Sequence, residues 1–151
     1  MISVTDFEKA LSGKTALIDS NIIIYLTDSV SPYAALSRRL FEMIEFGEVS
    51  ALISIISVGE VMQGPLKKGL DQTALAVKDY LLNFPNLFCE PMTNKVLDII
   101  GNDNRIQWSK LRTVDSFIIA SGLKNRVDKI ISNDNRFRQA LPNELLISFE
   151  S

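Results

Sequence analysis

Short apolar runs alternate with longer amphipathic stretches along the whole chain, and this alternation predicts the fold. Each run is bounded by polar or turn residues and is long enough for one buried strand. The runs predict strands at residues 15–18, 49–54, 87–89, 129–132 and 145–149. Strands that alternate with helices are typical of a parallel sheet covered on both faces. The pattern therefore predicts an α/β fold, a three-layer α/β/α sandwich with a central parallel sheet, in a single domain over residues 1–151.

Capping residues and helix breakers mark the ends of the predicted helices. Thr5 begins a capping box for the first helix, and Ser20 or Asn21 is expected to cap the helix after the first strand. Gly64-Pro65 is expected to end a short helix that follows the second strand. The polar stretch 101–109 has no periodicity that assigns it to a helix or a strand. The remaining helices are predicted at about residues 31–46, 71–83, 93–100 and 114–123.

The composition is that of an ordinary globular domain. Of the 151 residues, 46% are hydrophobic and 23% are charged, which is enough to build a core. The single cysteine, Cys89, cannot form an internal disulfide and fits a reducing compartment. No apolar run reaches the roughly 18 residues of a membrane span, and the first residues lack a signal-peptide pattern. We therefore expect a cytoplasmic protein that makes no membrane contact.

Four carboxylates lie at the margins of apolar runs. Asp19 follows the first predicted strand, Asp134 follows the fourth, and Glu60 and Asp115 lie in helices that can begin near the same edge of the sheet. Sites in parallel sheets form beyond the carboxyl ends of the strands. Because an unpaired, half-buried carboxylate is costly, four of them suggest a shared counter-ion. The spacing therefore predicts that these side chains converge around a divalent cation.

The residue types at this predicted site point to one chemistry. Mg²⁺ or Mn²⁺ prefers oxygen ligands, and the chain has no histidine, which argues against zinc. An acidic site of this kind typically serves phosphodiester hydrolysis. Taken singly, each residue has a simpler interpretation. Asp19 can be a helix cap, Glu60 a solvated helix residue, Asp115 an acid favoured by the helix dipole and Asp134 a turn residue. Their joint occurrence favours the site.

The chain resembles the PIN domain family, and in particular its single-domain VapC-type toxins. The resemblance implies a Mg²⁺- or Mn²⁺-dependent endoribonuclease, with metal binding by Asp19, Glu60, Asp115 and Asp134. It also implies that Ser20 and Asn21 support the site. The polar segment 101–105 departs from the family pattern, in which the segment that follows it is usually compact. The matching segments are residues 17–25, 53–64, 113–120 and 130–137, within a stretch from about 15 to 137.

The resemblance also implies partners. Basic residues near the motifs are candidates for RNA contact, since phosphate contacts give affinity without sequence information. The apolar residues of the stretches 31–46 and 71–84 favour a homodimer. Because the acidic pocket shows no positive side chain of its own, we expect the carboxyl-terminal segment of a VapB-like antitoxin to send an Arg or Lys into it. The RNA-contact candidates are Lys67, Lys68, Arg112 and Arg136.

Other functions remain open at this level. A PIN-like chain can serve housekeeping RNA processing, or it can be a non-catalytic interaction module. A haloacid-dehalogenase-like phosphatase would need a second aspartate where Asn21 stands. A receiver domain would need a lysine at the end of a later strand, which is not evident. The single tryptophan, Trp108, can stack on an unpaired base or belong to the core or a dimer interface, and the core or interface is favoured.

Overall fold

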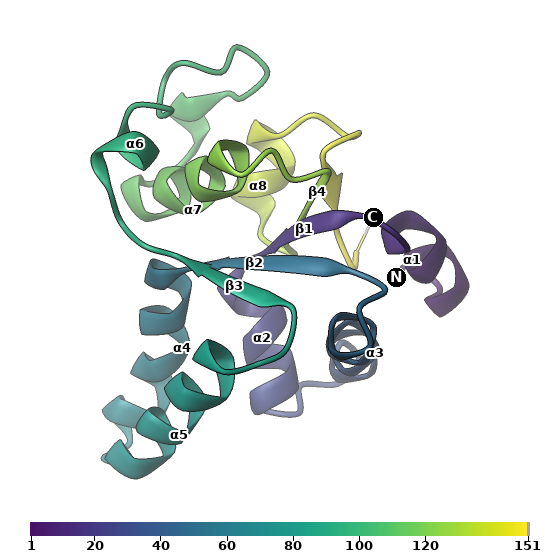
Figure 1. The fold of residues 1–151 in the computed structure, drawn as a ribbon, viewed down its shortest axis with the longest axis vertical. Helices are drawn as coiled ribbons and strands as arrows, with labels where there is room; N and C mark the ends of the chain where they lie inside the picture. Colours follow the sequence, from purple (N-terminus) through teal and green to yellow (C-terminus); the bar gives the residue numbers. More distant parts are fainter. Residues whose placement is uncertain (151) are drawn as a thin grey trace.

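The computed structural model describes residues 1–150 and contains a five-stranded, all-parallel sheet (Figure 1). The strand order is β3-β2-β1-β4-β5, so that β1 is central and β5 lies at one edge. All five predicted strands are present, and the predicted parallel sheet is confirmed. The strands are β1 (Thr15–Ile18), β2 (Ser50–Ser54), β3 (Leu87–Glu90), β4 (Lys129–Ile131) and β5 (Leu146–Ile147).

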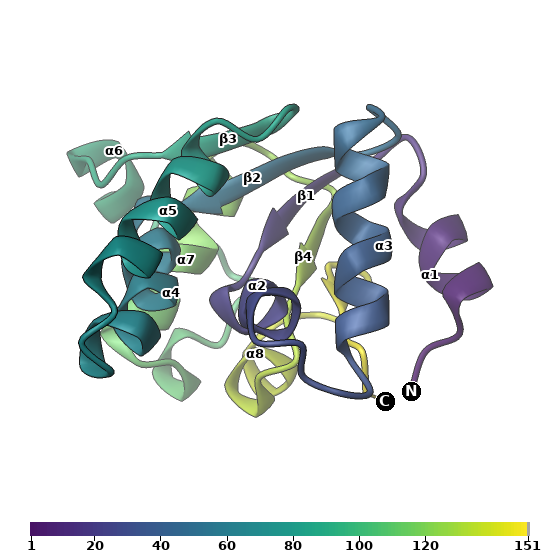
Figure 2. The same cartoon turned by 90° about the horizontal axis from the view of Figure 1, so that it is seen from below.

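Helices cover both faces of the sheet, which confirms the three-layer arrangement (Figures 1 and 2). The helices α2, α3, α4 and α5 form one layer, with α1 beside it, and α6, α7 and α8 form the other. No helix within residues 1–150 is long and apolar enough to cross a membrane. The helices are α1 (Val4–Leu11), α2 (Ser20–Thr27), α3 (Ala34–Glu45), α4 (Ile55–Lys67), α5 (Asp71–Leu82), α6 (Asn94–Leu97), the 3-10 turn η1 (Trp108–Lys110), α7 (Thr113–Lys124) and α8 (Asn135–Ala140).

The sheet is buried on both faces because its strands are apolar on both sides. Ala16 and Ile18 of β1 belong to the core under the layer of α2 to α5, whereas Leu17 faces the core under α7 and α8. Helix α7 comes very close to the sheet at Gly122. A Cβ atom there would lie 3.0 Å from Leu17 Cδ2 and 3.2 Å from Val127 Cγ2. This close packing holds α7 over β1 and thereby fixes where the helix begins.

Three of the predicted helix ends differ in the structure, each for a physical reason. Ser3, rather than Thr5, caps α1, since its hydroxyl accepts from the Asp6 backbone N–H. Asp19 itself caps α2, because its carboxylate accepts from the next backbone N–H. Helix α4 continues through Gly64-Pro65 to Lys67. Its packing against α5 outweighs the hydrogen bond that a proline cannot make.

Two segments that the pattern did not assign are ordered by tertiary contacts. Helix α8 follows Asp134 directly and was not predicted. In the polar stretch after α6, Ile106 is buried, and the Trp108 indole packs against the α7–α8 core while donating to the Asp103 carbonyl at 3.1 Å. The backbone N–H of Gln107 donates to the carbonyl of Ala140, so this stretch is tied to the end of α8. The core role favoured for Trp108 is thus the observed one.

Candidate active site

Asp19 is the most central of the predicted site residues. It follows β1, caps α2, and is only 4% exposed. Its Oδ1 accepts from the Ser20 backbone N–H at 2.8 Å, and its Oδ2 accepts from Ser132 Oγ at 2.6 Å and Asn21 Nδ2 at 3.3 Å. All three donors are uncharged. The carboxylate is therefore held in a fixed orientation without a positive partner of its own.

The pKa of Asp19 shows that other carboxylates are near it. This pKa is raised from 3.8 to about 6; burial is the largest cause of the rise, and the hydrogen bonds from Ser132 and Ser20 oppose it. The negative charges of Glu60 and Asp134 are smaller causes of the same rise. Glu60 and Asp134 are thus close enough for their charges to repel that of Asp19. Such repulsion is what a bound cation would remove.

Ser20 and Asn21 connect the neighbouring site residues, as supporting residues would. Ser20 Oγ donates to Glu60 Oε1 at 3.0 Å, so the backbone of Ser20 orients Asp19 while its side chain orients Glu60. The side chain of Asn21 donates to Asp19, and its Oδ1 accepts from the Asn133 backbone N–H at 3.3 Å. These contacts join β1, α4 and the loop after β4 at one edge of the sheet.

Asp115 lies in the first turn of α7 and is only 2% exposed, but its environment is different. Its Oδ2 accepts from the Arg112 backbone N–H at 3.1 Å and from Arg112 Nε at 3.0 Å, and its Oδ1 accepts from Arg112 Nη2 at 3.0 Å. The Asp115 carboxylate raises the pKa of Arg112, and the charges of Asp134 and Glu60 raise it too. The expectation of an acidic pocket without a positive side chain is therefore wrong, because Arg112 lies in it.

Asp134 completes the acidic group from the loop after β4. It caps α8, and its Oδ1 accepts from the Arg136 backbone N–H at 2.7 Å. Arg136 Nη1 lies 3.7 Å from Oδ2 as a partly exposed ion pair. The backbone N–H of Asp134 donates to Ser132 Oγ at 3.1 Å, and this hydroxyl in turn donates to Asp19. Asp134 and Asp19 are thus connected through a single buried serine.

Sequence reasoning missed Ser132 as a site residue. It is fully buried, at the end of β4, and it orients Asp19 and the Asp134 backbone together. The available signal was a small hydroxyl residue between a buried strand and an acidic residue.

Of the other basic candidates, Lys67 and Lys68 lie exposed at the end of α4. That end is seven residues beyond Glu60, or about 10 Å along the helix.

The oxygen-rich donor set suits Mg²⁺ or Mn²⁺, since these ions prefer carboxylates and the chain has no histidine. In the arrangement described, no three Asp, Glu, His or Cys side chains within residues 1–150 are close enough to hold one metal ion. Metal binding through the predicted residues therefore requires side chains to move. Release of Asp115 by Arg112 is one such movement, because Arg112 engages both carboxylate oxygens.

The chain thus combines an all-parallel α/β/α fold with acidic side chains at the carboxyl edge of its sheet. A model of the PIN domain matches residues 16–140, a range that contains all four carboxylates. The chain belongs to the PIN domain family. A comparison with curated proteins gives no match.

Solved structures with the same fold include several toxin–antitoxin proteins. VapBC from Salmonella typhimurium bound to DNA has a TM-score of 0.65 and 15% identity, covering 89% of this chain and 98% of that one. VapBC2 from Rickettsia felis, bound to a promoter DNA fragment, gives 0.63 and 16% over 89% and 98%. The sarcin–ricin loop cleaving toxin VapC20 from Mycobacterium tuberculosis gives 0.60 and 13% over 82% and 93%. At such identities the likeness shows a shared fold.

Proposed function

We propose that this chain is a divalent-metal-dependent endoribonuclease and the toxin of a VapBC-like toxin–antitoxin pair. The observation that carries the proposal is the gathering of Asp19, Glu60, Asp115 and Asp134 around one edge of a PIN-domain sheet. The charges of Glu60 and Asp134 act on Asp19, and those of Glu60, Asp115 and Asp134 act on Arg112. A housekeeping RNA-processing nuclease uses the same chemistry and is the second candidate.

In this proposal Asp19, Asp115 and Asp134 hold Mg²⁺ or Mn²⁺, and Glu60 completes the site. The bound ion supplies an activated water and stabilises the charge of the phosphodiester transition state. Ser132 and the Ser20 backbone hold Asp19 in one orientation, and Ser20 Oγ holds Glu60. Because the chain has no histidine pair to assist attack by the 2′-hydroxyl, we expect products with 5′-phosphate and 3′-hydroxyl ends.

The test is cleavage of RNA by the purified protein in Mg²⁺ and Mn²⁺, with Asp79→Asn as the matched control for Asp19→Asn. Asp79 is exposed on α5 and belongs to no site contact. We expect Asp79→Asn to cleave normally, and excess EDTA to stop cleavage. Activity that persists in EDTA, or products ending in 2′,3′-cyclic phosphate, would overturn the metal mechanism.

The proposed partners are RNA, an antitoxin and a second copy of the chain. Lys67, Lys68 and Arg136 are exposed and available to phosphates, and Arg112 becomes available when it leaves Asp115. The solved VapBC complexes with this fold support an antitoxin partner. An antitoxin arginine or lysine that enters the site must displace Arg112 or bind beside it.

Two measurements separate the toxin from the housekeeping nuclease. For a toxin, the protein encoded by the adjacent gene should co-purify with this chain, and the complex should cleave RNA more slowly than the free protein. If no neighbouring protein binds, or the complex is equally active, the housekeeping role is preferred.

For the homodimer, exposed Leu75, Tyr80 and Leu82 on α5 are the proposed contact. Light scattering at micromolar concentration should give twice the monomer mass, and a monomer mass would contradict the dimer.

A further inference from the structure

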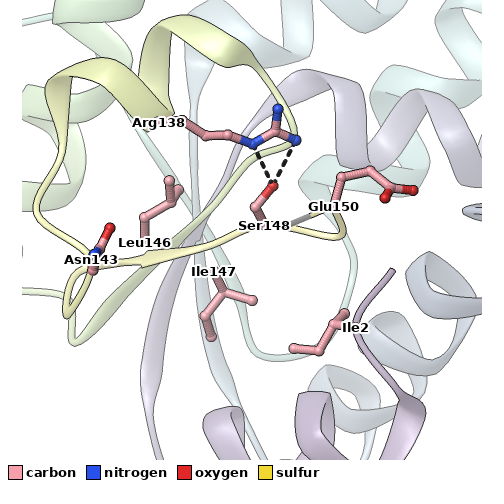
Figure 3. Close-up of a pocket in the computed structure, with 7 residues that line it drawn as sticks. All are labelled: Ile2, Arg138, Asn143, Leu146, Ile147, Ser148 and Glu150. Atoms are coloured by element: carbon pink, nitrogen blue, oxygen red, sulfur yellow. Dashed lines mark hydrogen bonds between the residues drawn. The ribbon is translucent and has the colours of Figure 1, made fainter.

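A hollow of about 380 Å³ opens near the carboxyl end of β5 (Figure 3). Its apolar wall includes Ile2 and Leu146, which are half-buried and accessible in the hollow. Its polar wall includes Arg138 from α8 and Ser148 from the segment after β5. Asn143 and Glu150 lie at opposite ends of the hollow in this view. The hollow thus combines apolar surface with hydrogen-bond donors and acceptors.

Arg138 is held in one orientation by uncharged acceptors. Its Nε and Nη2 donate to Ser148 Oγ at 3.1 and 3.0 Å, and Nη2 also donates to Asn133 Oδ1 at 2.8 Å. Nη1 donates to Asn135 Oδ1. Within residues 1–150, no carboxylate forms an ion pair with Arg138. These hydrogen bonds lie along the edges of the guanidinium, and Arg138 lines the hollow.

The hollow is structurally continuous with the acidic group. Asp134 caps α8, and Arg138 lies on that helix about one turn beyond the cap. Asn133 joins the two places, because its Oδ1 accepts from Arg138 while its backbone N–H donates to Asn21. The carboxyl ends of β4 and β5 meet at this same edge of the sheet. A strand of RNA with a phosphate near Asp134 can therefore reach the hollow with a neighbouring nucleotide.

We propose that this hollow binds an unpaired base of the RNA substrate, next to the phosphate that is cleaved. The base stacks on the face of Arg138 and packs against Leu146, and Asn143 or Glu150 reads its hydrogen-bonding edge. Proteins recognise single-stranded RNA by this combination of stacking and edge contacts. The Glu150 carboxylate, which also pairs with the Met1 ammonium at 3.5 Å, offers acceptor oxygens to the edge of an uncharged base. The inference rests on the proposed function, since it names how that nuclease selects its substrate.

The test compares short RNA oligonucleotides that contain one abasic nucleotide at successive positions. Binding is measured by fluorescence anisotropy in EDTA, so that no cleavage is needed. One abasic position should weaken binding to the unmodified protein about tenfold, the size of one stacking contact. Asn143→Ala and Arg138→Lys should weaken binding of the intact RNA but not of the RNA that is abasic at that position. Gln139→Ala, an exposed position on the same helix, is the matched control and should bind both RNAs normally.

Several outcomes separate the inference from the proposed function. If Asn143→Ala and Arg138→Lys weaken intact and abasic RNA equally, or change neither, the hollow does not bind a base. If they leave RNA binding unchanged and weaken binding of the antitoxin instead, the hollow is a peptide site and the inference is overturned. If the base-dependent effect is found but the protein never cleaves RNA, the hollow does bind a base and only the proposed cleavage fails. For the active protein, the two variants should also relax the base preference at one position beside the cut.

Discussion

Asp19 and Asp115 are two equally buried carboxylates whose charges are balanced in different ways. Asp19 is 4% exposed and Asp115 is 2% exposed. Asp19 accepts hydrogen bonds only from uncharged donors, and burial raises its pKa to about 6. Asp115 is paired through both oxygens with the guanidinium of Arg112. The two residues differ in their partners rather than in their burial: Asp115 is paired with a guanidinium, whereas Asp19 has uncharged partners.

The two carboxylates therefore respond to a cation in opposite ways. At Asp19 a cation supplies the positive charge that the folded chain lacks. At Asp115 the same cation competes with an existing ion pair. The net free energy of binding is therefore only the difference between the two interactions. Asp19 is thus available to a cation, whereas Asp115 is already paired with Arg112.

The largest effect is expected for Asp19→Asn. The amide keeps the shape of the side chain but removes the charge that would hold the ion. We expect cleavage to fall by roughly 100-fold or more, as it does when a transition-state contact is lost. Circular dichroism should show an unchanged fold, because the substitution opens no cavity. Undiminished cleavage by this variant would contradict the role proposed for Asp19.

The second effect is a pH dependence of stability without metal. The folded protein keeps a proton on Asp19 up to about pH 6, whereas the unfolded chain releases it near 3.8. Between these values the folded state binds more protons, so the free energy of unfolding falls as pH rises through this window. The contribution is about 3 kcal/mol, at 1.36 kcal/mol per pH unit.

Urea unfolding of the metal-free protein from pH 4 to pH 8 measures this contribution against Asp19→Asn. The variant should lack the part of the slope that belongs to Asp19, and should therefore gain stability over the unmodified protein above pH 6. Added Mn²⁺ should restore the stability of the unmodified protein above pH 6 but not that of the variant. Parallel curves for both proteins over the whole range would refute the assignment.

A third effect, of intermediate size, is expected at Asp115. Arg112→Ala removes the competing guanidinium, so Mn²⁺ should bind roughly tenfold more tightly, a typical size for one coupled interaction. The same variant should be less stable without metal, because a buried carboxylate loses its partner. Arg112→Lys keeps the positive charge, so its Mn²⁺ affinity and its stability should lie between those of Arg112→Ala and the unmodified protein. Titration calorimetry or the electron spin resonance of free Mn²⁺ gives the affinity, and weaker or unchanged binding would show that Arg112 is no competitor.

The smallest effect is expected for Arg136→Ala. The Arg136 side chain is 47% exposed and lies 3.7 Å from Asp134, and pairs of this kind contribute about 0.5 kcal/mol or less. We expect little change in stability or in Mn²⁺ affinity. RNA binding should weaken modestly and more at low salt than at high salt, since one phosphate contact is lost. A change in Mn²⁺ affinity as large as that of Arg112→Ala would remove the distinction between the two arginines.

Much of the fold could be predicted because periodicity is a local property. A strand buried on both faces is a short apolar run, and five such runs predicted the five strands of the sheet. The parallel order then placed Asp19 and Asp134 at one edge. Even the Arg112–Asp115 pair is local, since the two residues lie three apart at the start of a helix.

Other features depend on residues that are distant in the sequence. Ser132 lies 113 positions from Asp19, and only the pairing of β1 with β4 brings its hydroxyl to the carboxylate. Helix α4 passes through Gly64-Pro65 because it packs on α5, which no local signal reveals. The sequence by itself determined the strands, the layers and the four carboxylates, since these follow from apolar spacing and residue type. The tertiary structure alone decided which carboxylate accepts a hydrogen bond from a serine hydroxyl across the sheet, because that contact exists only once distant strands are paired.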